Sequence, residues 1–179
     1  MIEEVVLPDG QSINCHYLSK SVASHLGWLH SVRRPSQLQN NIKQKTMYEF
    51  HELQFIEVFA EEIISSKTDY DVVIAAPSSH PYSERYKNGL IAKKNLRDIS
   101  DRISRAGKQS ASTSSSFEEL EGEYHYTPGG DEGNFSSILI MDDVFGKGNT
   151  VLHIIRLLQK LGVPADAKFT VAVPLLAVN

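Results

Sequence analysis

The hydrophobic residues of this chain first fall into a regular pattern near residue 48. Between Tyr48 and Ile64 they recur every three or four positions with Glu residues between them, which predicts an amphipathic helix. The run Asp71–Ala76 is short, apolar and rich in β-branched residues, and it stops at Pro77, as is typical of a buried parallel strand. A second helix is expected from about Lys87 to Arg105.

A polar segment separates these elements from the rest of the pattern. Residues 107–134 are rich in Ser, Gly and Glu, so they predict a long surface excursion with one short extended piece at Glu121–Tyr126. Residues 1–45 give no clear pattern. Three further elements are expected after the excursion: a buried strand at Ser137–Met141, a helix at about Asn149–Leu161 and a last strand at Lys168–Val173.

This order of elements predicts the fold class. Strands that alternate with helices through short connections indicate a single α/β domain over residues 1–179, with a mostly parallel sheet flanked by helices in a Rossmann-like, three-layer arrangement. In such sheets the ligand binds at the carboxyl ends of the strands. Three connections should therefore meet at one edge of the sheet: the one after Ala76, the one after Met141 and the long excursion.

Composition and charge narrow the classes of function. The net charge of −4 provides no general basic field for nucleic acid, and Arg33, Arg34, Lys43 and Lys45 form only a local basic group. The single Cys15 excludes an intramolecular disulfide and a cysteine-cluster zinc site. No apolar run approaches the ~20 residues that span a bilayer, and the acidic N-terminus lacks the basic flank of a secretory signal. We therefore expect a cytoplasmic protein without a membrane partner.

The strongest chemical signal is the turn between the expected strand and helix in ILIMDDVFGKGNT, Ile138–Thr150. The strand delivers two adjacent carboxylates, Asp142 and Asp143, to the edge of the sheet. Gly146 and Gly148 then let the backbone turn tightly and approach a ligand closely. The N–H groups and the positive dipole end of the next helix favour a phosphate at the same place.

A pair of carboxylates beside an anion site implies a ligand with two different ends. A sugar phosphate fits this description, because its phosphate can lie in the loop while its vicinal hydroxyls donate to Asp142 and Asp143. Lys147 can add a positive charge and Thr150 a hydroxyl donor. A magnesium ion would balance the charge of the carboxylates.

Three other interpretations of this turn are possible. The acidic strand of an NTP-hydrolysing protein requires G-x-x-x-x-G-K-[ST], which the chain lacks. The acidic pocket of a receiver domain lies near the start of that domain, so most of the domain follows it. Here only about 37 residues follow Asp142, which are too few. An acidic turn that caps a helix and binds nothing stays open as the third interpretation.

The same segment resembles a known family signature. ILIMDDVFGKGNT is similar to the motif with which type I phosphoribosyltransferases bind phosphoribosyl pyrophosphate (PRPP), and Gly148 and Thr150 fall on its Gly and final Thr. Within that family the chain most resembles ComF-like proteins. Their strand-plus-proline segment is similar to VVIAAPSS, and their loop that carries Arg or Gln is similar to SRAGKQS followed by FEELEGEY. The resemblance covers about Asp71–Val173 and implies a phosphoribosyltransferase-like fold.

The resemblance also implies a set of site residues. Asp142 and Asp143 would hold the ribose hydroxyls of PRPP, with magnesium carried by PRPP rather than by a protein ligand set. Arg105 and Lys108, on the mobile loop of the family, would be the other catalytic residues and would face the diphosphate. The remaining substrate-binding residues would be Val144, Phe145, Gly146, Lys147, Gly148, Asn149 and Thr150 around the 5′-phosphate, and Pro77, Ser78 and Ser79 near the pyrophosphate.

Three functions follow from this resemblance. The first is an enzyme that transfers ribose 5-phosphate from PRPP to an unidentified acceptor and releases pyrophosphate. The second is a PRPP- or nucleotide-sensing module without turnover, which is favoured by Gly146 and Lys147 where the family carries Thr, Ser or Asp and then Thr. The third is a ComF-like accessory protein of DNA processing, although the Cys-rich zinc element common in that group is missing. Related proteins commonly form homodimers, so a homodimer is a further hypothesis.

Overall fold

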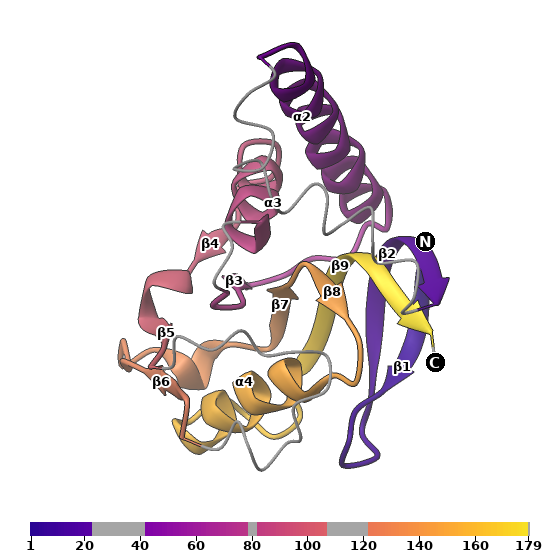
Figure 1. The fold of residues 1–179 in the computed structure, drawn as a ribbon. Helices are drawn as coiled ribbons and strands as arrows, with labels where there is room; N and C mark the ends of the chain where they lie inside the picture. Colours follow the sequence, from indigo (N-terminus) through magenta and orange to yellow (C-terminus); the bar gives the residue numbers. More distant parts are fainter. Residues whose placement is uncertain (23–41, 79–81, 107–121, 179) are drawn as a thin grey trace.

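Seven strands form one mixed sheet in the computed structural model, which describes residues 1–22, 42–78, 82–106 and 122–178 (Figure 1). The strand order is β1-β2-β9-β7-β3-β4, and β8 also pairs with β9. Only β1 and β2 are antiparallel; every other pair in this sheet is parallel. The bounds are β1 Ile2–Val6, β2 Ser12–Val22, β3 Val72–Ala75, β4 Arg97–Asp98, β7 Ser137–Met141, β8 Val144–Phe145 and β9 Lys168–Val178.

Helices cover both faces of this sheet. Helices α2 (Ile42–Ser65) and α3 (Tyr82–Ile91) lie on one face and α4 (Asn149–Lys160) on the other (Figure 1). Successive residues of a strand point to opposite faces, so Ile74 of β3 packs into the α4 layer while its neighbour Val73 packs into the α2–α3 layer. The prediction of a mostly parallel sheet flanked by helices is confirmed.

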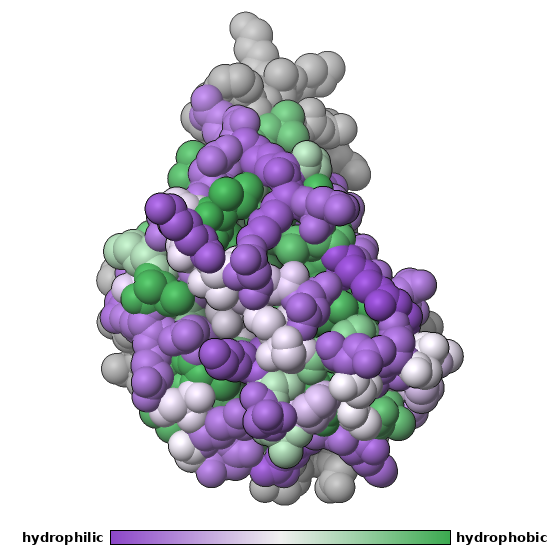
Figure 2. All heavy atoms as spheres, turned by 180° about the vertical axis from the view of Figure 1, so that it is seen from behind, coloured by the Kyte–Doolittle hydropathy of each residue, from purple (hydrophilic) through white to green (hydrophobic). Residues whose placement is uncertain are grey.

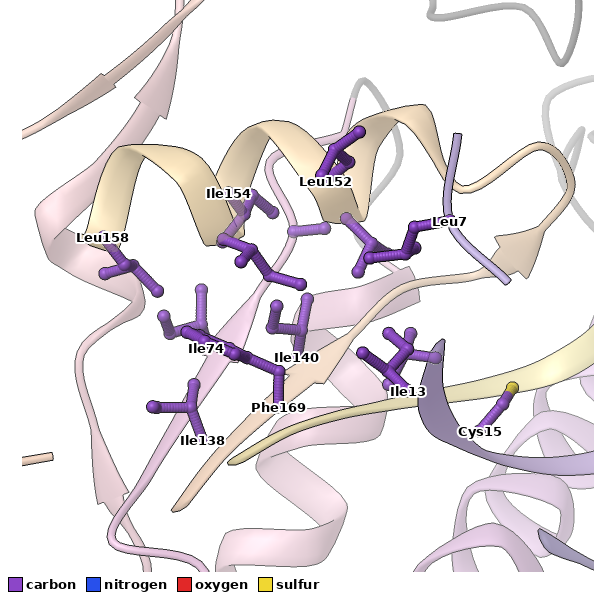
Figure 3. Packing of buried hydrophobic residues seen from close by; sticks show 14 of the residues in the cluster. Leu7, Ile13, Cys15, Ile74, Ile138, Ile140, Leu152, Ile154, Leu158 and Phe169 are labelled. Carbon is purple, nitrogen blue, oxygen red and sulfur yellow. The ribbon is translucent and has the colours of Figure 1, made fainter. Parts of the chain in front are cut away.

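The layer beneath α4 forms the larger core (Figure 3). Helix α4 turns one apolar face toward the sheet because its buried residues recur at helical spacing. Figure 3 shows Leu152, Ile154 and Leu158 of α4 above Ile140 of β7 and Phe169 of β9. This packing fixes α4, and therefore the turn that precedes it, against the central strands.

The outer surface is mixed rather than apolar. Figure 2, which shows the molecule from behind, has hydrophobic side chains in separate groups among hydrophilic ones. The exposed large hydrophobic residues of the described part are Met1, Ile2, Val6, Leu53 and Val58. No helix in the described ranges combines the length and apolar character that a membrane span needs.

The strands predicted at Ser137–Met141 and within Asp71–Ala76 are confirmed as β7 and β3. The helix predicted from Asn149 is confirmed as α4. Helix α2 begins earlier than the predicted Tyr48, and β9 extends five residues beyond the predicted Val173, to Val178.

The helix expected from Lys87 to Arg105 is wrong. Helix α3 ends at Ile91, and the chain then forms β4, a short 3-10 turn (Ser100–Arg102) and β5 (Ile103–Arg105). Leu96, Ile99 and Ile103 are all buried, and their spacing imitates one face of a helix. The Asp98 side chain accepts the backbone N–H of Ser100, two residues on, and this bond competes with helical hydrogen bonding.

The first 22 residues form the hairpin β1–β2, which the sequence analysis did not identify. Ile13, Cys15 and Tyr17 alternate into the core, but exposed Ile2 and Val6 on β1 hide the alternation of that strand. Strand β2 then pairs in parallel with β9. The basic group at residues 33–45 cannot be placed, because Arg33 and Arg34 lie outside the described residues and the side chains of Lys43 and Lys45 are not described.

The described end of the polar excursion is folded. The extended piece predicted at Glu121–Tyr126 corresponds to β6 (Tyr124–Tyr126), which pairs antiparallel with β5. A second short 3-10 turn, Glu132–Asn134, follows. The buried Glu132 carboxylate accepts bonds from the Tyr126 hydroxyl and from the backbone of Gly129 and Gly130, at 2.6–3.1 Å, so it holds this loop to β6. Residues 107–121 lie outside the described part.

A buried histidine in β2 makes stability depend on pH. His16 is 1% exposed, and its Nε2 lies 2.9 Å from the Tyr70 hydroxyl. Burial lowers the pKa of His16 to about 4, and the positive N-terminus of Met1 acts in the same direction. The unfolded chain takes up this proton near pH 6.5, so the free energy of unfolding should fall as the pH drops from 6.5 toward 4, by up to about 1.4 kcal/mol per pH unit.

We therefore expect His16→Gln to flatten the pH dependence of urea unfolding between pH 6.5 and pH 5, above the range in which most carboxylates titrate. The matched control is His125→Gln, which replaces an exposed histidine instead of a buried one. A His16→Gln profile as steep as that of the wild type would contradict this account.

Candidate functional site

The candidate site lies where β3 and β7 end together beside β9, which continues to Val178. The residue pair Ala75–Met141 brings the carboxyl ends of β3 and β7 to one place in the sheet, and Met141 also pairs with Ala172 within β9. The Ala76 N–H donates to the Met141 carbonyl at 2.8 Å, and the Asp142 N–H donates to the Ala172 carbonyl at 3.0 Å. The connections after Ala76 and Met141 therefore start side by side, as predicted.

The two carboxylates occupy a break between β7 and β8. The register with β9 is the same on both sides of the break, because Met141 pairs with Ala172 and Val144 with Leu175. Continuing this register places Pro174 opposite Asp143. Because proline has no N–H to donate, the ladder is interrupted at this point.

Asp142 is half-buried and Asp143 is only 8% exposed. The Asp143 N–H donates to Oδ1 of Asp142 at 2.8 Å, which holds the Asp142 carboxylate against its own backbone. A carboxylate has about four acceptor positions, so it can accept several donors at once. Two carboxylates are thus held at the end of the central strand.

The turn after the carboxylates leads directly into α4. Gly148 stands at the start of the helix with φ of +77°, a left-handed conformation that glycine adopts without strain. A Cβ at this position would lie 2.8 Å from Cζ of Phe145 and 3.0 Å from Cδ2 of Leu7, so the buried turn also has no space for a side chain. The sequence therefore requires glycine here for two separate reasons.

The start of α4 has the properties of an anion site. The first N–H groups of a helix have no acceptor within the helix, and the helix dipole is positive at this end. The first turn of α4 carries no acidic residue, and Gly148 supplies no capping side chain. Lys147 is exposed beside this turn, and Thr150 is half-buried within it.

Strand β6 closes the other side of this turn. The Tyr124 hydroxyl donates to Oγ1 of Thr150 at 3.4 Å, and the Tyr124 ring stacks on His153 with 6.0 Å between centroids. Burial raises the pKa of Tyr124 and the negative charge of Asp142 adds to this, while Thr150 and Arg105 oppose it. The end of the excursion therefore contacts the first turn of α4, next to the loop that follows β7, as predicted.

Arg105 is held beside this contact. Its Nε donates to Oε2 of Glu123 at 2.6 Å, and its guanidinium lies 5.6 Å from the centre of the Tyr124 ring. Its side chain is only 10% exposed. The charge of Arg105 is thus matched by Glu123 in this structure, and its role toward a diphosphate stays a prediction.

Most of the predicted site residues lie at this edge of the sheet. Pro77 and Ser78 follow β3, next to the carboxylates and the turn Val144–Thr150 that follow β7. Ser79 and Lys108 lie outside the described residues. Tyr124 was missed by the sequence analysis; the only signal for it is the alternation of aromatic residues in Tyr124–Tyr126, which marks a strand but not its contact with α4.

No known family model matches the chain, and no curated protein is detectably similar to it.

Substitution of Gly148 tests the steric constraint on the turn that precedes α4. We expect Gly148→Ala to lower the free energy of unfolding by about 2–4 kcal/mol, because it adds left-handed strain to a steric overlap with Phe145 and Leu7. Gly10→Ala is the matched control, since Gly10 also has a positive φ but nothing lies within 4 Å of the added atom. It should cost only about 1–2 kcal/mol in denaturant unfolding. Equal losses in the two variants would contradict the proposed packing of the turn.

Proposed function

We propose that this protein binds PRPP and transfers its ribose 5-phosphate to an acceptor with release of pyrophosphate, on a phosphoribosyltransferase-like, ComF-like fold. One observation carries the proposal. Two carboxylates end the central strand, and a glycine turn and an uncapped helix start follow them directly. This pairing suits a ligand that presents hydroxyls and a phosphate a few bonds apart.

The phosphate end of the ligand would lie against the start of α4. There the first backbone N–H groups can donate to phosphate oxygens. Lys147 adds an ammonium, which partly replaces the hydroxyl donors that the family motif carries at this point. The Thr150 hydroxyl, held in place by Tyr124, can donate as well.

The ribose would lie over Asp142 and Asp143. Carboxylates are strong acceptors for hydroxyl donors, and two neighbouring hydroxyls can be shared between two neighbouring carboxylates. The same negative charges would stabilise the ribose as its carbon 1 becomes positive while the bond to pyrophosphate breaks. Binding and catalysis would then use the same pair of side chains.

The diphosphate end would lie toward the turn after β3. The 5′-phosphate and the diphosphate leave opposite sides of the ribose, and neighbouring strands are about 4.8 Å apart. A ligand whose phosphate lies after β7 therefore extends toward Pro77 and Ser78. Arg105 and Lys108 remain the proposed cations on the excursion.

Magnesium fits this donor set. In the described part of the chain no three His, Cys, Asp or Glu side chains lie close enough to hold a metal. Magnesium commonly binds through one or two carboxylates together with substrate phosphates, so it would arrive with the diphosphate near Asp142 and Asp143. When bound, it would neutralise charge on the leaving pyrophosphate.

A sensing module is the second candidate function. Gly146 and Lys147 remove two side-chain hydroxyls that the family places around the 5′-phosphate. Such a pocket could keep its affinity for PRPP while losing the geometry for transfer. The accessory role in DNA processing stays a prediction without a structural observation in its favour.

Calorimetric titration with PRPP tests the binding proposal. We expect magnesium-dependent binding by the wild type, and a loss of about tenfold or more in Asp142→Asn/Asp143→Asn, because charge-assisted bonds to the ribose hydroxyls are removed. Asp166→Asn is the matched control, since Asp166 is exposed beyond α4. Unchanged affinity in the double variant, or no binding by folded wild type, would contradict the proposal.

Release of pyrophosphate separates the two candidate functions. With PRPP, magnesium and a panel of bases and amines, a transferase should release pyrophosphate only when an acceptor is present. Binding without any release would instead support the sensing module.

A further inference from the structure

A buried lysine on α3 forms a charged cluster with two exposed carboxylates near the turn that follows β3. Lys87 of α3 has a side chain that is 5% exposed, and its ammonium lies 2.6 Å from Glu84 and 2.7 Å from Asp98. Burial disfavours the charge, but the two carboxylates outweigh it and raise the pKa of Lys87. The ammonium is therefore charged and matched at neutral pH.

Asp98 connects Lys87 to the end of β3. Its Oδ1 accepts the Ser100 N–H at 2.9 Å and the Ser100 hydroxyl at 2.6 Å. The side-chain Oγ of Ser100 in turn accepts a hydrogen bond from the Ala75 N–H at 2.8 Å. Because β4 has only two residues and pairs only with Val72 and Val73, the Ser100 side chain takes the place of a strand neighbour for Ala75.

Ala76, the first residue after β3, is held through both its backbone carbonyl and its backbone N–H. The Ser83 hydroxyl of α3 donates to the carbonyl of Ala76 at 2.9 Å. The Ala76 N–H donates to the Met141 carbonyl at 2.8 Å. The backbone that leads into Pro77 and Ser78 is therefore held from three directions: by β7, by α3 and by Ser100.

We propose that Lys87, acting through Asp98 and Ser100, is a positioning residue for the turn at Pro77–Ser78. This inference rests on the proposed function, in which that turn receives the diphosphate of PRPP. Lys87 itself does not bind the ligand, since two carboxylates already match its single charge. The cluster acts on the diphosphate end of the site and not on the 5′-phosphate end, which α4 forms.

Hydrogen exchange tests the positioning without any ligand. In Ser100→Ala, the Ala75 amide should exchange about tenfold faster or more, because it loses its acceptor. The Ala76 amide is the internal control, since it is bonded to Met141, and it should change by less than about twofold. Ser100→Thr keeps the hydroxyl and should restore protection of Ala75. Unchanged exchange at Ala75 in Ser100→Ala would overturn the proposal.

Binding of two separate ligands tests the consequence for the site. We expect Ser100→Ala and Lys87→Met to bind magnesium pyrophosphate about tenfold more weakly and ribose 5-phosphate within about twofold of the wild type. Lys93→Met is the matched control, because Lys93 pairs with Glu57 and Glu61 on the surface and should leave both affinities unchanged. If Lys87→Met does not fold, Lys87→Met/Asp98→Asn removes both charges together.

The outcomes separate this inference from the proposed function. Equal weakening of both ligands would show a merely structural role for the cluster and overturn the inference. A wild type that binds ribose 5-phosphate but not magnesium pyrophosphate would also overturn it, while the phosphate site would stand. A wild type that binds neither ligand would overturn the proposed function, and with it the role of Lys87 in the site.

Discussion

The pairing of β7 with a parallel strand on each side is the constraint on which the candidate site depends. Strands β3 and β7 are parallel and end together, so the loops that follow them start side by side, while β9 pairs along the other side of β7. Met141 is bonded into both ladders, and Asp142 is the first residue beyond it. The position of the carboxylates thus follows from backbone hydrogen bonds rather than from side-chain contacts.

Packing on the two faces of the sheet holds the turns at this edge in place. Helix α4 is pressed onto β7 and β9 by its apolar face, and its start is tied to the N-terminal hairpin through Leu7, which packs beside Gly148. On the opposite face, Ser83 of α3 donates to the Ala76 carbonyl just after β3, and Lys87 of α3 pairs with Asp98 of β4. The turns after β3 and β7 are therefore held by different layers, and a change in one layer should affect one turn more than the other.

The elements that could be predicted from the sequence are those whose residues are buried in a simple pattern. Strands β3 and β7 are buried on both faces and appear as short apolar runs, and α4 has one clear apolar face. The carboxylates and the glycine turn were predicted with them, because both lie in one continuous segment. By contrast, Leu96, Ile99 and Ile103 imitate a helix although they lie in irregular backbone and short strands.

The contacts that join distant segments could not be predicted in the same way. Tyr124 reaches Thr150 and Ser100 reaches Ala75 only because the sheet brings these residues together, and no local pattern encodes either contact. Lys87 lies on the buried face of α3 with Tyr86 and Leu90, and its ammonium pairs with Asp98 of β4, which the sequence of α3 alone does not indicate. Such pairings depend on tertiary structure, which a single sequence shows only indirectly.

Chemical-shift mapping with ribose 5-phosphate tests the central claim, that the end of β7 and the start of α4 form a sugar-phosphate site. We expect the largest shifts on the backbone amides from Asp143 to Val151, and weaker binding of 2-deoxyribose 5-phosphate because one hydroxyl donor to the carboxylates is missing. Shifts confined to another part of the protein, or equal affinity for the two sugars, would contradict it.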